Sequence, residues 1–261
     1  MTFTIVARDD SASKTIGSKL TESLTSIGHH YVEQQPDYVF FVGGDGTFLR
    51  AVQQFILDVH HTIFVGIHSG SLGFFCEYGK DEMDRLIHDI PTFEQRKKTY
   101  ALLEMNIDAN HAQTFYAVNE VRIEDPFQTL VTNVSIDDTQ LETFRGTGLI
   151  VSSTLGSSAY NKSLGGSVID GQIQTLQLTE MAAIQNNVYR SLGSSIVLHP
   201  SRILRFKGEF TSAIFGYDHH LFKPEESIRE VIVKLSKKTL SIVHQQRHSY
   251  IETIHKTFVK N

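Results

Sequence analysis

The spacing of apolar residues along the first hundred positions alternates between two patterns. Short runs of β-branched and aromatic residues, such as YVFFV at residues 38–42, contain no polar member and predict strands buried on both faces. Between these runs, apolar residues recur at every third or fourth position, as at Ile16, Leu20 and Leu24, which predicts helices. Strands that alternate with helices indicate an α/β domain whose parallel, doubly wound sheet binds ligands at the carboxyl ends of its strands.

A different pattern begins near Thr99. Short segments of alternating apolar and polar residues, separated by Asn, Asp and Pro, predict a β-rich, sandwich-like C-terminal domain. The last residues return to helical spacing through Ile251, Ile254 and Phe258, and we expect this C-terminal helix to pack back on the N-terminal domain. The expected organisation is an α/β domain at 1–98, a β-rich domain at 99–240 and a C-terminal segment at 241–261.

Composition limits the classes of function. Hydrophobic residues make up 40% of the 261 positions and charged residues 20%, as in ordinary soluble globular proteins. The net charge of −5 argues against a broad basic surface for nucleic acid, and the apolar runs are too short to cross a bilayer. No signal peptide is visible, and the single cysteine, Cys76, suits a reducing compartment. We therefore expect a cytoplasmic protein with no nucleic-acid or membrane partner.

The 13 histidines do not form a metal-binding pattern. Three adjacent pairs occur, but adjacent residues do not share a helix face, and no HExxH or Cys/His spacing accompanies them. We therefore expect no metal ligands from the protein and interpret the histidines as surface or pocket residues.

The glycine-rich turn after residues 38–42 carries the first candidate chemistry. Its sequence is GGDGT, and we expect a helix to begin near Thr47, so that backbone amides of the turn point towards a phosphate. The lysine of a P-loop and the third glycine of a dinucleotide fingerprint are both missing. Asp45 either caps the following helix or acts as a base that deprotonates a substrate hydroxyl in phosphoryl transfer. The candidate phosphate-turn residues are Gly43, Gly44 and Thr47.

Two further stretches are rich in groups that bind nucleotides. Residues 146–166, GTGLIVSSTLGSSAYNKSLGG, combine hydroxyls and glycines with interleaved apolar residues, so they suit ribose and phosphate oxygens better than a disordered linker. Asn119 and Glu120 are adjacent in a strand-like segment and therefore point to opposite faces. They belong either to an edge strand facing water or to a cleft, where they would bind a ribose diol or a base amine.

Five segments resemble the NAD kinase family, whose members phosphorylate the adenosine 2′-hydroxyl of NAD to form NADP. They cover nearly the whole chain in the family's order: GGDGTFLR (43–50), GIHSGSLGFF (66–75), VNEV (118–121), FRGTGLIVSSTLGSSAYNKSLGG (144–166) and LTEMAAIQNNVYR (178–190). GGDGT is shared with diacylglycerol, sphingosine and phosphofructo-kinases, so the segment that contains AYN is the more specific. The α/β-then-β layout also fits the compact bacterial members of the family.

The resemblance implies a role for each matching residue. Asp45 corresponds to the general base, which lies beside the acceptor hydroxyl, and residues 99–240 correspond to the NAD-binding domain. Asn119 and Glu120 match residues that hold the adenosine ribose and the adenine. The positions implied to bind substrate are Gly46, Phe74, Asn119, Glu120, Arg145, Thr147, Ser158, Ala159, Tyr160, Ser163, Ala182, Ile184, Tyr189 and His219.

The resemblance also implies partners. The usual phosphoryl donor of the family is ATP bound to Mg²⁺, and some bacterial members also use polyphosphate. In the family, a neighbouring subunit contributes some of the pocket residues, which implies a homo-oligomer, usually a tetramer.

Two residues depart from the family's pattern. Thr147 stands between Gly146 and Gly148 where the family has an aspartate, and Leu155 replaces a proline, which relaxes the backbone of the loop. Neither change touches Asp45, so we expect catalysis to survive with altered affinity. Two other functions remain open: a lipid or sugar kinase of the same superfamily, and a sensor that binds NAD or NADP without turnover.

Overall fold

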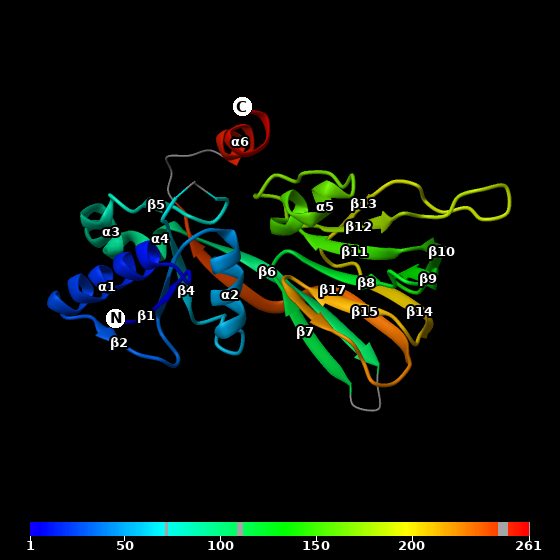
Figure 1. Cartoon of the computed structure of the whole chain (residues 1–261), viewed down its shortest axis with the longest axis horizontal. Helices are drawn as coiled ribbons and strands as arrows, with labels where there is room; N and C mark the ends of the chain where they lie inside the picture. The colour runs from blue at the N-terminus through cyan, green and yellow to red at the C-terminus, as the bar shows by residue number, and fades with distance from the viewer. Residues whose placement is uncertain (71–72, 109–111, 245–249, 261) are drawn as a thin grey trace. The chain divides into compact units, whose positions relative to one another are not determined.

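The computed structural model describes residues 1–70, 73–108, 112–244 and 250–260 (Figure 1). The chain forms two compact units. One comprises Met1–Tyr100 with Lys238–Asn261, and the other comprises Ala101–Lys237. Two long strands connect the units: β6 (Lys97–Asp108) and β17 (Ile228–Val243).

The first unit is built on a parallel sheet. Its strands pair in the order β2–β1–β3–β4, and both β5 and the end of β17 pair with β4. The bounds are β1 (Thr2–Ala7), β2 (His30–Tyr31), β3 (Tyr38–Val42), β4 (Ile63–His68) and β5 (Tyr78–Gly79). All five residues of β3 are buried, as the YVFFV run predicts for a strand with both faces covered.

Helices cover both faces of this sheet. Phe40 and Phe41 point to opposite faces because they are adjacent in β3. Phe40 lies in a core cluster with residues of α1 (Ser11–Ser26), α3 (Met83–Asp89) and α4 (Phe93–Arg96). Phe41 contacts Phe48 of α2 (Asp45–Gln54), with ring centroids 5.1 Å apart. The sheet is therefore doubly wound.

The C-terminal segment returns to the first unit. It contains the short helix α6 (Tyr250–Ile254) and the π-helix η3 (His255–Val259). Phe74, in the connection between β4 and β5, lies with its ring centroid 5.8 Å from that of Phe258 and 6.3 Å from that of Tyr250. The expected return of the C-terminal helix is confirmed.

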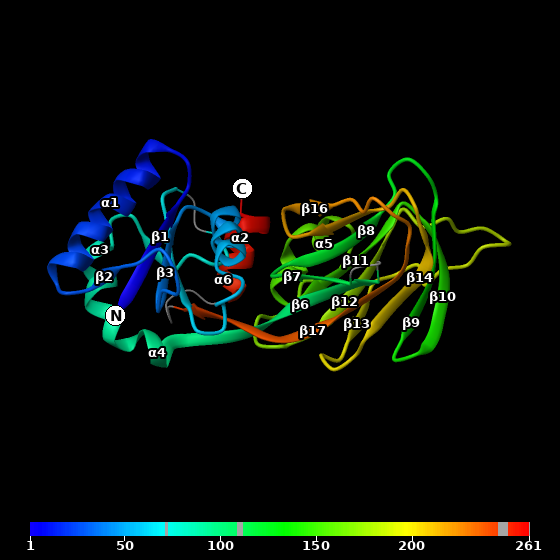
Figure 2. The same ribbon diagram turned by 90° about the horizontal axis from the view of Figure 1, so that it is seen from below.

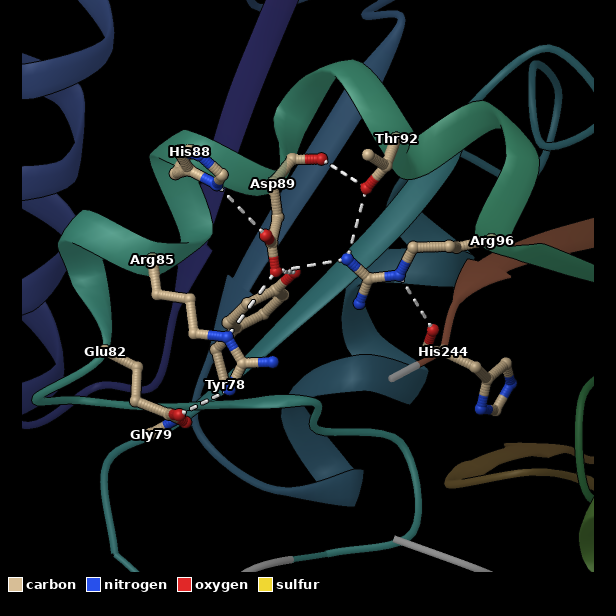
Figure 3. A network of polar contacts seen from close by, with 9 residues as sticks. All are labelled: Tyr78, Gly79, Glu82, Arg85, His88, Asp89, Thr92, Arg96 and His244. Atoms are coloured by element: carbon tan, nitrogen blue, oxygen red, sulfur yellow. Dashed lines mark hydrogen bonds and ion pairs between the residues drawn. The ribbon is translucent and has the colours of Figure 1, made fainter. Parts of the chain in front are cut away.

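A polar network fixes the connection from α3 through the 3-10 turn η1 (Ile90–Thr92) to α4 (Figure 3). Asp89 accepts hydrogen bonds from the Tyr78 hydroxyl at 3.0 Å and from Arg96 at 3.1 Å. Arg96 also donates to the carbonyl oxygen of His244 at 3.3 Å, which ties the turn to the end of β17. Burial alone would raise the pKa of Asp89, but its hydrogen bonds with Tyr78 and Arg96 hold that pKa below its usual range.

The second unit is an antiparallel sandwich (Figure 2). One sheet has the order β10–β9–β14–β17–β6–β7, and the other has the order β13–β12–β11–β8–β15–β16. Phe206 and Phe144 from the first sheet and Phe215 from the second meet in one buried core. The bounds are β7 (Gln113–Ala117), β8 (Glu120–Glu124), β9 (Leu130–Ile136), β10 (Thr139–Gly146), β11 (Gly148–Ser153), β12 (Leu176–Met181), β13 (Ile196–Leu198), β14 (Leu204–Phe210), β15 (Ile214–Tyr217) and β16 (His220–Phe222).

The stretch with the sequence GSSAYNKS is folded, as the interleaved apolar residues predicted. It forms the 3-10 turn η2 (Leu155–Ser158) and the one-turn helix α5 (Tyr160–Ser163) directly after β11. Asn161 of α5 is fully buried and accepts a hydrogen bond from the Thr179 hydroxyl at 2.9 Å. This buried amide fixes the turn to β12 and gives the AYN segment a structural role.

The predicted fold class is confirmed: an α/β unit with a parallel sheet, a β-rich sandwich and a C-terminal helix that returns to the first unit. One helix boundary differs from the prediction: α2 begins at Asp45 rather than near Thr47. Residues 71–72 of the GIHSGSLGFF segment, and 245–249 and 261 of the expected C-terminal segment, lie outside the described residues. In the ranges that the structure describes, no helix combines the length and apolar character needed to cross a membrane.

Candidate active site

Asp45 is the first residue of α2, at the carboxyl end of β3. Its carboxylate does not cap this helix, because the N-cap residue is Gly44 and no side chain caps the turn. Instead, Oδ2 accepts a hydrogen bond from the backbone N–H of Phe74 at 3.2 Å, and Oδ1 accepts one from Phe75 at 3.3 Å. The capping interpretation is therefore wrong, and the carboxylate is bound to the neighbouring loop instead.

The glycine at position 73 makes this arrangement possible. A Cβ atom built on Gly73 would lie 2.3 Å from Oδ1 of Asp45, well inside van der Waals contact. Beyond it, the Phe75 ring stacks on Phe48 of α2, with centroids 4.2 Å apart, which fixes the loop against the helix. Burial raises the pKa of Asp45 above its ordinary value, and the two backbone hydrogen bonds only partly offset this effect.

The other predicted residues of the first unit surround Asp45. Gly43 is buried and donates its N–H to the carbonyl of Ile67 at 2.9 Å, while Gly46 is exposed at the start of α2. A Cβ atom built on Gly44 would meet open space. A Cβ atom built on Gly43 would lie 2.2 Å from Oγ1 of the buried Thr47, so the two residues are in close contact. The turn thus leaves backbone open to a ligand beside the Asp45 carboxylate.

In the second unit, Asn119 and Glu120 lie at the start of β8, between β11 and β15. Both are buried, so the interpretation as a water-facing edge strand is wrong. The carboxylate of Asp218 fixes the backbone before them: it accepts the N–H of Asn119 at 2.7 Å and the N–H of Val118 at 2.9 Å. Asp218 itself has a left-handed backbone with φ 49°, which places it in the tight turn after β15.

This cluster has polar atoms that find no partner among the described residues. Oδ1 of Asn119, Oε2 of Glu120 and Oγ of Ser152 are buried and make no hydrogen bond there. Ser152 pairs with Glu120 across β11 and β8, so the two side chains lie on one face. Burial, assisted by the charge of Asp218, raises the pKa of Glu120 to about 8. Buried polar groups without partners indicate a place for a polar ligand.

The loop after β11 packs directly on this cluster. A Cβ atom on Gly156 would lie 1.9 Å from the carbonyl oxygen of Asn119, so only glycine allows this approach. Ser153 accepts from the N–H of Gly156 at 3.2 Å and donates to the Val118 carbonyl at 2.6 Å. The predicted residues Ser158, Ala159, Tyr160 and Ser163 follow Gly156 in the same loop.

Tyr160 and His219 form the rim of the cluster. The half-exposed Tyr160 ring lies over the guanidinium of Arg122, 5.5 Å from the ring centroid. His219 is exposed and follows Asp218, and its ring is tilted against that of His220 with centroids 4.0 Å apart. Asp218, Ser152, Ser153 and Arg122 were not among the predicted site residues. Arg122 could have been found as a cation two positions from Glu120 on the same strand face.

The remaining predicted residues form a separate group at the other end of β11. Arg145 stacks under Tyr189, 4.4 Å from its ring centroid, and its carbonyl accepts the N–H of Ile184 at 2.7 Å. Thr147 is exposed and lines a shallow groove of about 250 Å³ with Ala182 and Ile184. Because β11 spans four residue steps from Gly148 to Ser152, this group lies about 13 Å from the Glu120 cluster along the strand.

The described residues do not supply a cluster of three or more His, Cys, Asp or Glu side chains arranged to hold a metal ion. Cys76 is buried beside the turn and donates to the carbonyl of Gly43 at 3.3 Å. Burial raises the pKa of its thiol far above the ordinary value, so Cys76 acts as a packed structural residue.

Comparison with known proteins identifies the family of this chain. The family described as "ATP-NAD kinase C-terminal domain" matches residues 118–245. A NAD kinase from Latilactobacillus sakei is 35% identical over 263 residues, which cover 99% of this chain and 98% of that protein. The chain therefore belongs to the NAD kinase family.

Two solved structures share the fold at low sequence identity. Yeast NADH kinase, solved in complex with NADH, superimposes with a TM-score of 0.85 at 16% identity and covers 100% of this chain and 89% of its own. A NAD kinase from Archaeoglobus fulgidus, solved in complex with ATP, has a TM-score of 0.76 at 18% identity and covers 95% of each chain.

The titration of Glu120 provides a test of the second cluster. We expect the Glu120 carboxyl to change protonation at a pH of about 8, because burial disfavours its charged form. Carboxyl ¹³C NMR of glutamate-labelled protein would show this midpoint in a resonance that disappears in Glu120→Gln. A midpoint near the ordinary value of 4.5 would contradict the burial described above.

The same proton makes stability depend on pH. Between about 4.5 and about 8 the folded protein retains a proton that the unfolded chain has lost, so this group makes the free energy of unfolding fall as pH rises. Glu120→Gln should remove that part of the slope in urea unfolding, while the exposed Glu225→Gln should leave the slope unchanged.

Proposed function

We propose that this chain is a NAD kinase that transfers the γ-phosphoryl group of ATP to the adenosine 2′-hydroxyl of NAD⁺. The observation that carries the proposal is the placement of Asp45: a carboxylate in a GGDGT turn that is held by two loop amides and does not cap its own helix. Membership of the NAD kinase family supports the same reaction.

In this proposal Asp45 is the general base. Its raised pKa improves its ability to accept the 2′-hydroxyl proton, and the amides of Phe74 and Phe75 fix the orientation of its oxygens. As the oxygen–phosphorus bond forms, the bond from the γ-phosphorus to the bridging oxygen breaks, ADP leaves, and the proton passes to Asp45. The open backbone at Gly44 and Gly46 is the place proposed for phosphate contacts.

Mg²⁺ is proposed as a companion of ATP rather than a metal held by a protein cage. The glycine turn offers one carboxylate, which fits Mg²⁺ because this ion keeps several waters and binds mainly substrate phosphates. When bound, the ion would neutralise charge on the transferred group.

The NAD⁺ molecule is proposed to bind in the second unit at the cluster of Asn119, Glu120 and Ser152. Their unpartnered oxygens accept hydrogen bonds from hydroxyl and amine donors, which the adenosine ribose and adenine supply. The exposed face of Tyr160 suits stacking on the adenine ring. The bound donors should lower the pKa of Glu120, because they stabilise its charged form.

A homo-oligomer with shared sites is proposed because the resemblance to the NAD kinase family implies it. Arg145, Thr147 and Tyr189, which lie about 13 Å along β11 from Glu120, are the residues proposed to take part in the site of a neighbouring copy. Thr147 carries no charge where the family has an aspartate, and this proposal places the resulting difference in affinity at the shared face.

Substitution of Asp45 tests the reaction and the base. Asp45→Asn keeps the shape of the side chain but cannot accept the proton, so NADP⁺ formation should fall by at least about 100-fold. Enzyme-coupled detection of NADP⁺ with NAD⁺, Mg²⁺ and either ATP or polyphosphate measures the rate, and EDTA tests the need for the ion. Below neutral pH, wild-type kcat/KM should decline with a midpoint above the usual range of aspartate.

Two outcomes would contradict this proposal. Full activity in Asp45→Asn would remove Asp45 as the base. Wild-type protein that binds NAD⁺ but forms no NADP⁺ with any donor would support a dinucleotide sensor instead.

The close approach of Gly73 to Asp45 gives a second test. Gly73→Ala places a methyl group against Oδ1 and should displace the carboxylate, lowering kcat by about 100-fold for a shift of roughly 1 Å. Gly70→Ala is the matched control, because Gly70 lies in the same connection and a Cβ there meets open space. Equal activities of the two variants, with both proteins folded by circular dichroism, would show that Gly73 does not position the base.

Subunit sharing can be tested by complementation. Asp45→Asn and Tyr189→Ala are each expected to reduce activity, and co-expression places an intact Asp45 beside an intact Tyr189 of another chain. If sites are shared, random mixed oligomers should recover about a quarter of wild-type activity. No recovery, or a monomer in light scattering, would exclude the shared site.

A further inference from the structure

Two glutamates that the proposed reaction does not use face each other at one edge of the sandwich. Glu142 belongs to β10 in one sheet, and Glu180 belongs to β12 in the other. Their Oε2 atoms accept the backbone N–H groups of adjacent residues, Leu192 and Gly193, which brings the two carboxyl groups close together. Each has an oxygen, Oε1, that is buried and has no hydrogen-bond partner among the described residues. Two ionised carboxylates offer only acceptors and repel each other, so two carboxyl groups held this close are stabilised by a proton between them.

The other oxygens of the pair hold one segment of the chain. Oε2 of Glu142 accepts the backbone N–H of Leu192 at 2.8 Å, and Oε2 of Glu180 accepts the N–H of Gly193 at 3.1 Å. The hydroxyl of Ser191 also donates to Oε2 of Glu180, at 3.0 Å. The two carboxyl groups therefore grip neighbouring residues, and they can do so together only while they stay close to each other.

The gripped segment carries Tyr189. Within the segment at 182–193, the Gln185 amide donates to the hydroxyl of Ser191 at 2.8 Å, which joins its two arms. The Tyr189 ring packs on Arg145, with the guanidinium carbon 4.4 Å from the ring centroid. The side chain of Val188 at the tip is 78% exposed, and Asn186 Oδ1 accepts the N–H groups of Val188 and Tyr189 there at 2.8 Å. The base of the segment is held by the carboxyl pair on one side and by the hydrogen bond from the Ile184 N–H to the Arg145 carbonyl, at 2.7 Å, on the other.

The charges around the pair do not offset repulsion between two ionised carboxylates. On β9, β11 and β13, which flank β10 and β12, no residue is charged. Within β10 and the segment, Arg145 is stacked on Tyr189 and Arg190 is exposed. Burial, together with the Glu180 charge, raises the pKa of Glu142 to about 7.

We propose that Glu142 and Glu180 share one proton and act as positioning residues that hold the segment at 182–193, and with it Tyr189, against Arg145. When the proton leaves to solvent, repulsion separates the carboxylates, and they no longer hold the adjacent amides of Leu192 and Gly193 together. An effect on catalysis rests on the proposed function, since Tyr189 enters it as a residue of the NAD⁺ site. The structural effect on the segment does not.

Trypsin provides a direct test because Arg190 is exposed within the segment. Wild-type protein, Glu142→Gln and Glu180→Gln are digested side by side from pH 6 to 8.5, and mass spectrometry follows the fragments cut after Arg190. A glutamine amide donates permanently to the remaining carboxylate, so these variants should stay closed at every pH. The ratio of wild-type to variant cleavage should rise by about tenfold across this range, as the deprotonated fraction does.

The ratio cancels the pH dependence of trypsin itself. Glu225→Gln, an exposed substitution in the connection between β16 and β17, should behave as wild type. A ratio that stays constant with pH would overturn the proposal. If both glutamine variants are unfolded, hydrogen exchange in the wild type decides: exchange at Leu192 and Gly193, corrected for intrinsic base catalysis, should accelerate above pH 7, and unchanged protection would overturn the proposal.

Kinetics separate this inference from the proposed function. If the chain is a NAD kinase, the ratio of the wild-type KM for NAD⁺ to the KM of Glu142→Gln should rise between pH 6.5 and 8.5, with a smaller change in the ratio of kcat values. The titration of Glu120 is common to both proteins and cancels in this ratio. A pH-dependent cleavage ratio without NADP⁺ formation would leave the carboxyl pair standing and reject the kinase. NADP⁺ formation with a cleavage ratio that does not change with pH would support the kinase and reject the shared proton of the carboxyl pair.

Discussion

The first unit depends on the pair of hydrogen bonds from the Phe74 and Phe75 amides to Asp45. A carboxylate at this depth is costly to ionise unless donors reach it, and the parallel order of β3 and β4 brings the donors to the same edge of the sheet. Gly73 allows the approach because it lacks a Cβ, and the stack of Phe75 on Phe48 fixes the distance. Strand order, loop packing and the position of one carboxylate are therefore a single constraint.

In the second unit a buried carboxylate also accepts backbone N–H groups, but here it fixes the backbone beside the candidate site rather than forming part of it. The buried carboxylate of Asp218 accepts hydrogen bonds from the backbone N–H groups of Val118 and Asn119. Oδ1 of Asn119 and Oε2 of Glu120 therefore do not take part in holding this backbone. Gly156 then brings the next loop onto the Asn119 carbonyl. Because the backbone is fixed by these hydrogen bonds, the side-chain oxygens can accept hydrogen bonds from a ligand. A binding site of this kind is preorganised before its ligand binds.

The sequence was informative where one segment determines its own environment. The uniform YVFFV run indicated a buried strand, and GGDGT indicated a turn with a carboxylate at the sheet edge. The sequence could not distinguish a helix-capping carboxylate from a loop-bound carboxylate at Asp45, because the deciding donors lie 29 and 30 residues away. Asp218 was not predicted for the same reason, because it lies 99 residues from Asn119. The approach of Glu142 and Glu180 could not be predicted either, since it depends on the packing of two sheets. Contacts between distant residues follow from topology rather than from local pattern.

At three carboxyl groups of this chain burial raises the pKa, and the groups that contact each carboxyl decide the role proposed for it. Burial raises the pKa at Asp45, Glu120 and Glu142 alike. Asp45 has two amide donors, which keep its charged form accessible and suit it to accept a proton. Glu120 has an oxygen without a donor among the described residues and gains one only from a ligand. Glu142 faces a second carboxyl and so depends on a proton held in common. The proposed base, the proposed ligand contact and the proposed positioning residue thus differ in what their oxygens touch.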